Sequence, residues 1–148
     1  MSLNEEVELL QKIPLFAKIE PAKLKLLAFT SERLTYEPGQ NLCRQGEMGD
    51  AAYLIMEGEA DILVDGPNGA IKVATAGRNE IVGEIAILCD VRRTATVTAA
   101  TRLTALKISK DMFFRLVAEF PQMAVEMMRE LAQRLMTTTE QLRQATKD

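Results

Sequence analysis

Apolar and polar residues follow three different patterns along the chain, and the changes between them mark three segments. In residues 4–30, apolar positions recur at helical spacing and are interrupted by Pro14 and Pro21, which predicts two short helices joined by a tight connection. Residues 33–108 contain short apolar runs separated by glycine, proline and asparagine turns, a pattern typical of β-strands. In residues 109–146 the helical period returns.

The middle segment is predicted to form an antiparallel β-roll. The expected strands are residues 53–56, 60–64, 71–74, 94–98 and 103–108. Their connections are too short for the helical crossovers of a parallel sheet, and many short strands suit a sandwich or barrel. We therefore expect a mainly β fold, a jelly-roll-like antiparallel β-roll with N-terminal helices and a long C-terminal helix. With 148 residues, the chain is expected to form one domain, residues 1–148.

The C-terminal segment has the pattern of a short helix followed by a long one. Ser109 suits an N-cap, Pro121 suits a first helical turn, and neither glycine nor proline occurs after Pro121. Apolar residues then recur at spacings of four and three, with Thr138 filling one place: Ala124, Met128, Leu131, Leu135, Leu142 and Ala145. This stripe predicts a homodimer that forms through the helix. The alternative, that the stripe packs on the chain's own β-roll, stays open.

Composition narrows the class of protein. The chain is 47% hydrophobic and 26% charged with a net charge of -3, so it has the balance of a globular domain and no basic surface for nucleic acid. No apolar run is long enough to span a membrane and the start does not resemble a signal peptide, so we expect a cytoplasmic protein without a membrane partner. Cys43 and Cys89 form no metal-binding motif and are expected to be buried, reduced thiols.

Histidine is absent from the chain. This excludes serine and cysteine nucleophiles activated by histidine, the common zinc sites and histidine-ligated haem. No pair of carboxylate, lysine or tyrosine residues stands in a recognisable catalytic motif. We therefore expect no enzyme activity, no metal site and no cofactor.

The sequence indicates a phosphate-binding segment at residues 82–97. Gly83 can adopt backbone angles closed to other residues, and a helical turn after it would expose unpaired amides that attract an anion. Those amides belong to Glu84, Ile85 and Ala86. Arg93 adds a planar guanidinium that can hold two phosphate oxygens from the other side.

Glu84 indicates what else the ligand carries. A carboxylate beside a phosphate is repulsive unless it binds another group, and a neighbouring sugar hydroxyl would supply a donor. One phosphodiester with one free hydroxyl describes a cyclic nucleotide. In the alternative interpretation, Glu84 only favours the positive end of a short helix, and Arg93 is a surface arginine paired with Asp90 or Glu84.

This segment resembles the phosphate-binding cassette of the cyclic-nucleotide-binding domain family. The family pattern is Gly-Glu-aliphatic-Ala, a short loop, then Arg followed by a small residue and Ala, and residues 83–97 match it in residue type and spacing. The resemblance implies that Glu84 holds the ribose 2′-hydroxyl, Arg93 the cyclic phosphate, and the amides of Ile85 and Ala86 the same phosphate. Thr94 would face the ligand. Asn79 and Arg92 depart from the common pattern, which has glycine and proline at these places.

The long helix is similar to that of the bacterial catabolite-activator type within the family, over residues 131–140. The likeness implies that Thr138 and Thr139 contact the base, one of them from the partner subunit, with Arg134 nearby. The apolar wall for the base would come from Ile62, Val73 and Ala74. In the alternative, the threonines are a polar interruption of the apolar stripe.

The function expected is that of a regulatory sensor domain that changes conformation when it binds cAMP or cGMP. Thr94 is compatible with either base, whereas the likeness at Thr138 favours cAMP. The output would be contact with an effector protein of unknown identity, because the chain ends at Asp148 before the DNA-binding domain that catabolite activators carry. The alternative is a degenerate domain that serves as an interaction or dimerisation scaffold without nucleotide.

Overall fold

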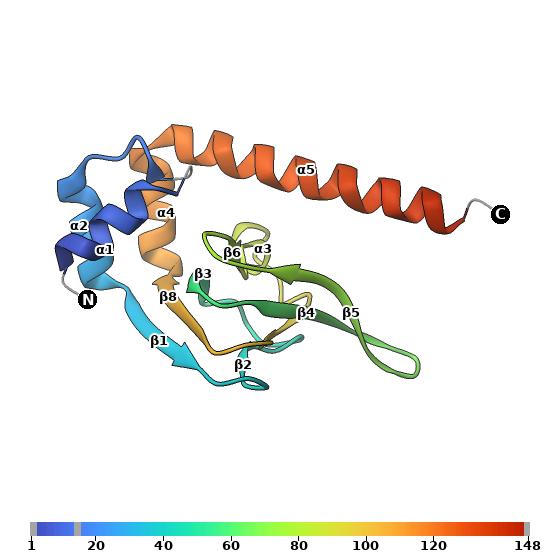
Figure 1. Cartoon of the computed structure of the whole chain (residues 1–148). Coiled ribbons are helices and arrows are strands. Elements are labelled where there is room, and N and C mark those ends of the chain that lie inside the picture. Colours follow the sequence, from blue (N-terminus) through green and yellow to red (C-terminus); the bar gives the residue numbers. More distant parts are fainter. Residues whose placement is uncertain (1–2, 14–15, 147–148) are drawn as a thin grey trace.

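The structure is a computed structural model that describes residues 3–13 and 16–146, and it shows a β-roll with helices packed at one end (Figure 1). The helices are α1 (Leu3–Gln11), α2 (Pro21–Thr30), α3 (Glu84–Leu88), α4 (Lys110–Glu119) and α5 (Pro121–Ala145). The strands are β1 (Glu32–Tyr36), β2 (Asn41–Cys43), β3 (Ala51–Glu57), β4 (Ala60–Gly66), β5 (Gly69–Ala76), β6 (Ile81–Val82), β7 (Thr96–Ala99) and β8 (Leu103–Ser109). The predicted fold class is confirmed. Pro14 lies outside the described residues.

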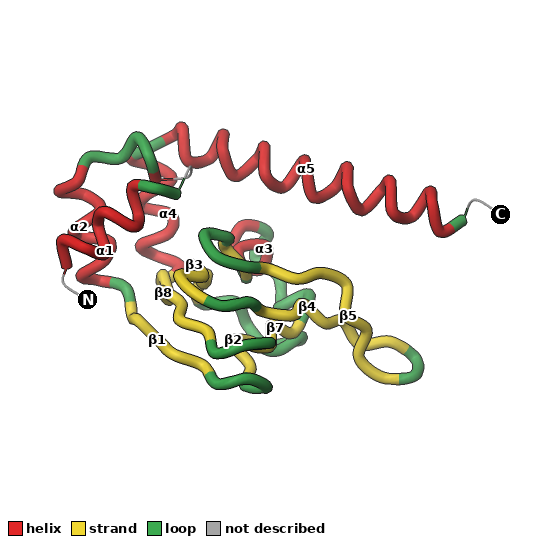
Figure 2. The backbone as a smooth tube through the Cα atoms, in the orientation of Figure 1, coloured by secondary structure: helices red, strands yellow, loops and turns green. Residues whose placement is uncertain are grey.

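The strands form two antiparallel sheets that face each other. One has the order β1-β8-β3-β6 and the other β2-β7-β4-β5, so neighbours in sequence often lie in different sheets. The β4–β5 hairpin projects from the roll on the same side as the free end of α5 (Figure 2). The roll thus has a closed end under the helices and an open side between β5 and α5.

Strands β3 and β8 carry buried apolar residues on both faces, and in β3 this gives a nearly continuous apolar sequence. In β3, Leu54 packs in the core shared with the helices, whereas Ile55 packs inside the roll. In β8, Leu106 and Leu103 divide in the same way. These two strands therefore tie the helical layer to the roll.

The helix boundaries follow the capping signals in the sequence. The hydroxyl of Ser109 accepts a hydrogen bond from the backbone N–H of Met112 at 3.2 Å, as expected of an N-cap. Helix α5 begins at Pro121, also as expected. Its first half is anchored by the buried Met123 and Met127, but every residue from 135 to 146 is exposed.

The expectation of two buried thiols is half wrong. Both cysteines are free and Cys43 is buried, but Cys89 is exposed. Cys89 is the C-cap of the five-residue helix α3 and lies in an exposed stretch, residues 88–92, whereas the buried residues of the helix lie before it. A further difference is that the short strands β1, β2 and β6 were not among the expected strands.

Candidate functional site

Gly83 sets the geometry of the predicted cassette. It lies directly before α3 with φ +81°, a left-handed conformation that suits glycine. A Cβ atom at this position would lie 2.6 Å from the Nη1 atom of Arg93. Glycine is therefore required both for the backbone turn and for the close approach of the arginine.

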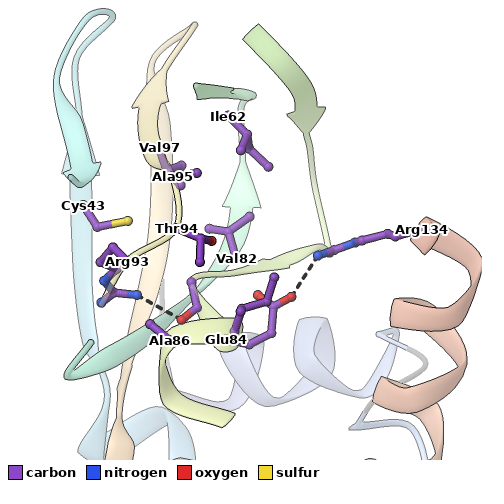
Figure 3. A pocket seen from close by; sticks show the side chains of 12 residues that line it. Cys43, Ile62, Val82, Glu84, Ala86, Arg93, Thr94, Ala95, Val97 and Arg134 are labelled. Carbon is purple, nitrogen blue, oxygen red and sulfur yellow. Dashed lines mark hydrogen bonds and ion pairs between the residues drawn. The ribbon is translucent and has the colours of Figure 1, made fainter. Parts of the chain in front are cut away.

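Arg93 is buried with only 4% of its surface exposed, so the interpretation as a surface arginine is wrong. Nη1 donates to the carbonyl of Gly83 at 2.9 Å (Figure 3), and Nη2 donates to the carbonyl of Ala51 at 2.8 Å. The guanidinium also lies 5.7 Å from the ring centre of Tyr53, within cation–π range. Its nearest carboxylate is Asp50 at 3.5 Å, whose side chain is 74% exposed.

The loop between β2 and β3 holds the backbone of the cassette. The backbone N–H of Arg93 donates to the carbonyl of Glu47, and the N–H of Gly46 donates to the carbonyl of Arg93. Gly49 packs so closely on Ala86 that an added Cβ would lie 2.5 Å from the Cβ of Ala86. This loop comes from a distant part of the sequence, so the sequence analysis missed Asp50, Glu47 and Gly49 as parts of the site. The only signal was a cluster of turn residues.

Glu84 is buried to 2% exposure and points toward α5. Its Oε1 atom accepts a hydrogen bond from Nη1 of Arg134 at 2.8 Å (Figure 3), and Nη2 of Arg134 donates to the carbonyl of Ile81 at 3.1 Å. Among the described residues, Arg134 is the only hydrogen-bond partner of this carboxylate. The long helix is thereby bonded directly to the first residue of the cassette helix.

The structure brings the six predicted cassette residues together around one pocket (Figure 3). They are Gly83, Glu84, Ile85, Ala86, Arg93 and Thr94. The remaining lining comes from Cys43, Ile62, Val82, Ala95, Val97 and Arg134. The empty space of the pocket, counted out to its open mouth, is about 440 Å³. Its wall is mostly apolar, with a cation and a carboxylate set apart on it.

The predicted base contacts are divided between this pocket and a neighbouring groove. Ile62 lines the pocket, Val73 and Ala74 of β5 and Thr138 of α5 line the groove, and Arg134 lines both. Thr139 is exposed and lines neither. The groove also contains Glu80 and Glu130, which the sequence analysis did not single out.

Burial changes the acidity of several groups around the site. It raises the pKa of the Cys43 thiol, so the thiol stays protonated at neutral pH. It also raises the pKa of Tyr53 to about 12. Burial raises the pKa of the Glu130 carboxyl as well, against the opposing effect of Arg134.

Two deviations from the common cassette pattern are accommodated. Asn79 adopts φ +72°, the left-handed conformation for which asparagine can replace glycine. Arg92 is fixed by a hydrogen bond from its Nη1 atom to the carbonyl of Gly46 at 3.0 Å. Neither side chain lines the pocket.

The described residues contain no group of three histidine, cysteine, aspartate or glutamate side chains placed to hold a metal ion. None of the helices in the described part of the chain is long and apolar enough to cross a membrane. The buried charged groups on the wall of the pocket are one cation, Arg93, and one carboxylate, Glu84.

The chain belongs to the cyclic nucleotide-binding domain family, which it matches over residues 33–120. It is 37% identical over 108 residues to the cAMP-dependent protein kinase regulatory subunit of Yarrowia lipolytica, covering 73% of this chain and 28% of that protein. It is 27% identical over 136 residues to the CRP-like cAMP-activated global transcriptional regulator of Mycobacterium tuberculosis, covering 91% and 61%. The crystal structure of Thermus thermophilus catabolite activator protein superposes with a TM-score of 0.77 at 25% identity, covering 90% and 63%. The chain thus spans less than two thirds of each of these relatives.

Proposed function

We propose that the chain is a regulatory sensor that binds a cyclic nucleotide, with cAMP preferred to cGMP. The observation that carries the proposal is the buried guanidinium of Arg93 on the wall of the pocket, whose nearest carboxylate, Asp50, is largely solvated. A buried charge is costly unless it is paired and hydrogen-bonded. Arg93 is hydrogen-bonded to two carbonyls and pairs with Asp50 at 3.5 Å, and a cyclic phosphate in the pocket would add a second counter-charge that is better shielded from solvent.

Arg93 can take up a phosphate without losing its present partners. A guanidinium has five N–H donors, and two of them serve the carbonyls of Gly83 and Ala51. The remaining donors, with the amides of Ile85 and Ala86, would hold the phosphate. The carbonyl bonds then act as supports that fix the plane of the guanidinium before the ligand arrives.

Glu84 supports a sugar hydroxyl as the second anchor. Arg134 occupies its Oε1 atom, and the carboxylate has a second oxygen that can accept from the ribose 2′-hydroxyl. The base would then lie along Ile62 and extend into the groove beside Val73 and Ala74. Thr94 would add a hydroxyl on the phosphate side.

The preference for cAMP rests on α5 and on the relatives. Thr138 lines the groove that would receive the base, and Arg134 lies between groove and pocket. Thr139 faces solvent in the single chain, so we place it against the base of a second copy. The two relatives named for cAMP support the same choice.

The response to ligand would pass from α3 to α5. Glu84 begins α3 and is bonded to Arg134 of α5, so a ligand that engages Glu84 changes a contact of the long helix directly. Ligand would draw the cassette inward and reposition α5, shifting the population between two conformations. An effector protein would read that shift. The negative net charge supports a protein effector over nucleic acid, and we place the domain in the cytoplasm.

A homodimer through α5 belongs to the same proposal. The stripe that was predicted to pair two subunits is open, with Met128, Leu135 and Leu142 each more than 60% exposed. A helical segment with no packed face is marginal in water, so residues 135–146 would gain stability from a second helix. The alternative that the whole stripe packs on the chain's own roll does not fit this exposure.

We propose binding without catalysis and without a cofactor. The chain lacks histidine, and the thiol of Cys43 in the pocket is kept protonated by burial. The pocket therefore offers anchors for a ligand and no activated nucleophile.

Isothermal titration with cAMP and with cGMP tests the proposal, using the wild-type chain and the variants Arg93→Ala and Arg93→Lys. We expect binding of cAMP tighter than cGMP, and a loss of about thirtyfold or more in both variants, because lysine keeps the charge but not the planar fork. Circular dichroism checks that each variant is folded. Absence of heat and of any thermal shift with both nucleotides would instead identify a scaffold with an empty pocket.

A further inference from the structure

The groove beside the pocket holds more negative than positive charge. Glu80 and Glu130 line it together with Arg134, and Arg134 is paired with Glu84 on the other side. The groove therefore contains two carboxylates beside a guanidinium that is already paired with a third. Arg134 lines both the groove and the pocket, so the groove adjoins the site that is proposed to bind an anion.

The pKa of the Glu130 carboxyl is raised, so this group is harder to keep ionised than an ordinary glutamate. It is half-buried and lies one helical turn before Arg134 on α5. Burial is the main cause that raises its pKa, and Glu84, Glu126 and Glu80 raise it further, while Arg134 lowers it. Arg134 thus attracts several carboxylates at once, and its effect is too small to bring the pKa of Glu130 back to the ordinary value.

We propose that Glu130, assisted by Glu80, sets the ligand affinity of the pocket: its negative charge opposes the entry of an anionic ligand, and removal of that charge tightens binding. The inference rests on the proposed binding of a cyclic nucleotide. Charges beside a partly desolvated groove interact more strongly than charges in water, and Glu130 lines a groove that shares Arg134 with the pocket. Glu130 acts as a positioning residue through the field it creates and through Arg134, with no contact to the ligand required.

The sign of the pH dependence follows from linkage. Above its raised pKa, Glu130 is ionised and opposes the ligand; as the pH falls through that pKa, Glu130 becomes neutral and affinity rises. By reciprocity, a bound anion raises the pKa of Glu130 further. The chain has no histidine, whose ordinary titration would otherwise dominate between about pH 5 and pH 7. A change of affinity in this window therefore points to a carboxyl group with a raised pKa.

The experiment compares cAMP affinity of wild type, Glu130→Gln and Glu140→Gln at about pH 7.5 and pH 5.5. Glu140 is the matched control, because it lies on the same helix but is exposed and paired with Arg143. We expect Glu130→Gln to bind about fivefold more tightly than wild type at the higher pH, at the lower end of typical coupling between sites. Wild type and Glu140→Gln should tighten on acidification, whereas Glu130→Gln should change much less.

A carbon-13 NMR titration of the Glu130 carboxyl, with and without cAMP, gives a second readout that a merely structural role would not change. Its pKa should rise when cAMP is added. Equal affinities of Glu130→Gln and wild type, or parallel pH profiles, would overturn the inference while leaving nucleotide binding intact. Binding detected only in Glu130→Gln, or binding by wild type only at the lower pH while Glu130→Gln binds at both, would support it. Absence of binding in every protein at both pH values would overturn the proposed function, and this inference with it.

Discussion

At the scale of single residues, Gly83 and Arg93 form one unit. The glycine gives the left-handed turn before α3 and leaves room for the guanidinium, which in turn donates to the glycine's own carbonyl. The arginine is thereby fixed in the pocket wall before any ligand is present. A side chain at position 83 would disturb both the turn and the anion site.

Gly83→Ala should lower the free energy of unfolding by about 1–2 kcal/mol, the cost of a left-handed conformation for an ordinary residue, and should weaken cAMP binding. Urea denaturation measures the first effect and calorimetry the second. Gly77→Ala is the control, because an added Cβ there meets no atom within 4 Å. Equal stability of the two variants would contradict the account.

The two thiols should differ in reactivity. Cys89 is exposed, whereas burial of Cys43 raises the pKa of its thiol, so Cys43 yields little of the reactive thiolate until the pH is raised through that pKa. N-ethylmaleimide should modify Cys89 first at neutral pH, and cAMP should slow the modification of Cys43 because this thiol lines the pocket. Peptide mapping by mass spectrometry follows each site. Modification of Cys43 that is as fast as that of Cys89, or unaffected by cAMP, would argue against the proposed binding mode.

Whether the sequence predicts a residue of the site depends on how far along the chain that residue lies from the cassette. The cassette residues are contiguous, so the turn at Gly83 and the return of Arg93 could be expected from local rules. Asp50 and Glu47 reach the site from another loop, and Glu130 reaches it from the C-terminal helix. No short-range pattern encodes these contacts, which arise only when the roll closes.

At the scale of elements, the contact between α3 and α5 joins the cassette to the long helix. Glu84 is almost fully buried, while Arg134 is partly exposed. Loss of the arginine leaves a buried carboxylate without its partner, whereas loss of both charges removes that penalty. The pair should therefore show energetic coupling.

Arg134→Gln should lower the free energy of unfolding by about 1–3 kcal/mol, and the double variant with Glu84→Gln should lose less than the sum of the two single changes. Chemical denaturation of the four proteins gives the coupling energy. The exposed pair of Glu140 and Arg143 on the same helix serves as the reference cycle, with about 0.5 kcal/mol or less expected. Coupling no larger than in the reference cycle would contradict a link between α3 and α5.

Long, buried strands and helices can be predicted from the sequence more readily than short ones. The runs of β3 and β8 are long and apolar because both faces are covered, and they could be found in the sequence. Strands β2 and β6 have three and two residues and depend on pairing with distant partners, so their sequences carry little signal. The period of α5 was clear, but the sequence could not decide which residues meet the roll.

At the scale of the whole molecule, the exposed half of α5 lies beside the open side of the roll (Figure 1). Its apolar stripe continues past the last buried residue of the helix, Met127. In the proposed dimer, a second copy covers the stripe and Thr139 lies against the base. Dimerisation and ligand binding should therefore support each other.

Leu135→Glu should convert a dimer into a monomer, since it places a charge in the centre of the stripe. Size-exclusion chromatography with light scattering measures the mass. Gln122→Glu changes the charge at an exposed position outside the stripe and should leave the dimer intact. A wild-type chain that stays monomeric at high concentration, with and without cAMP, would contradict the proposed homodimer.

The most direct test of the central claim is a crystal structure of the chain grown with cAMP. We predict the cyclic phosphate within hydrogen-bond distance of Arg93 and the ribose 2′-hydroxyl on Glu84, with the base between the roll and α5. A nucleotide bound elsewhere, or a pocket that remains empty at saturating cAMP, would contradict the claim that Arg93 and Glu84 are the anchors of a cyclic-nucleotide sensor.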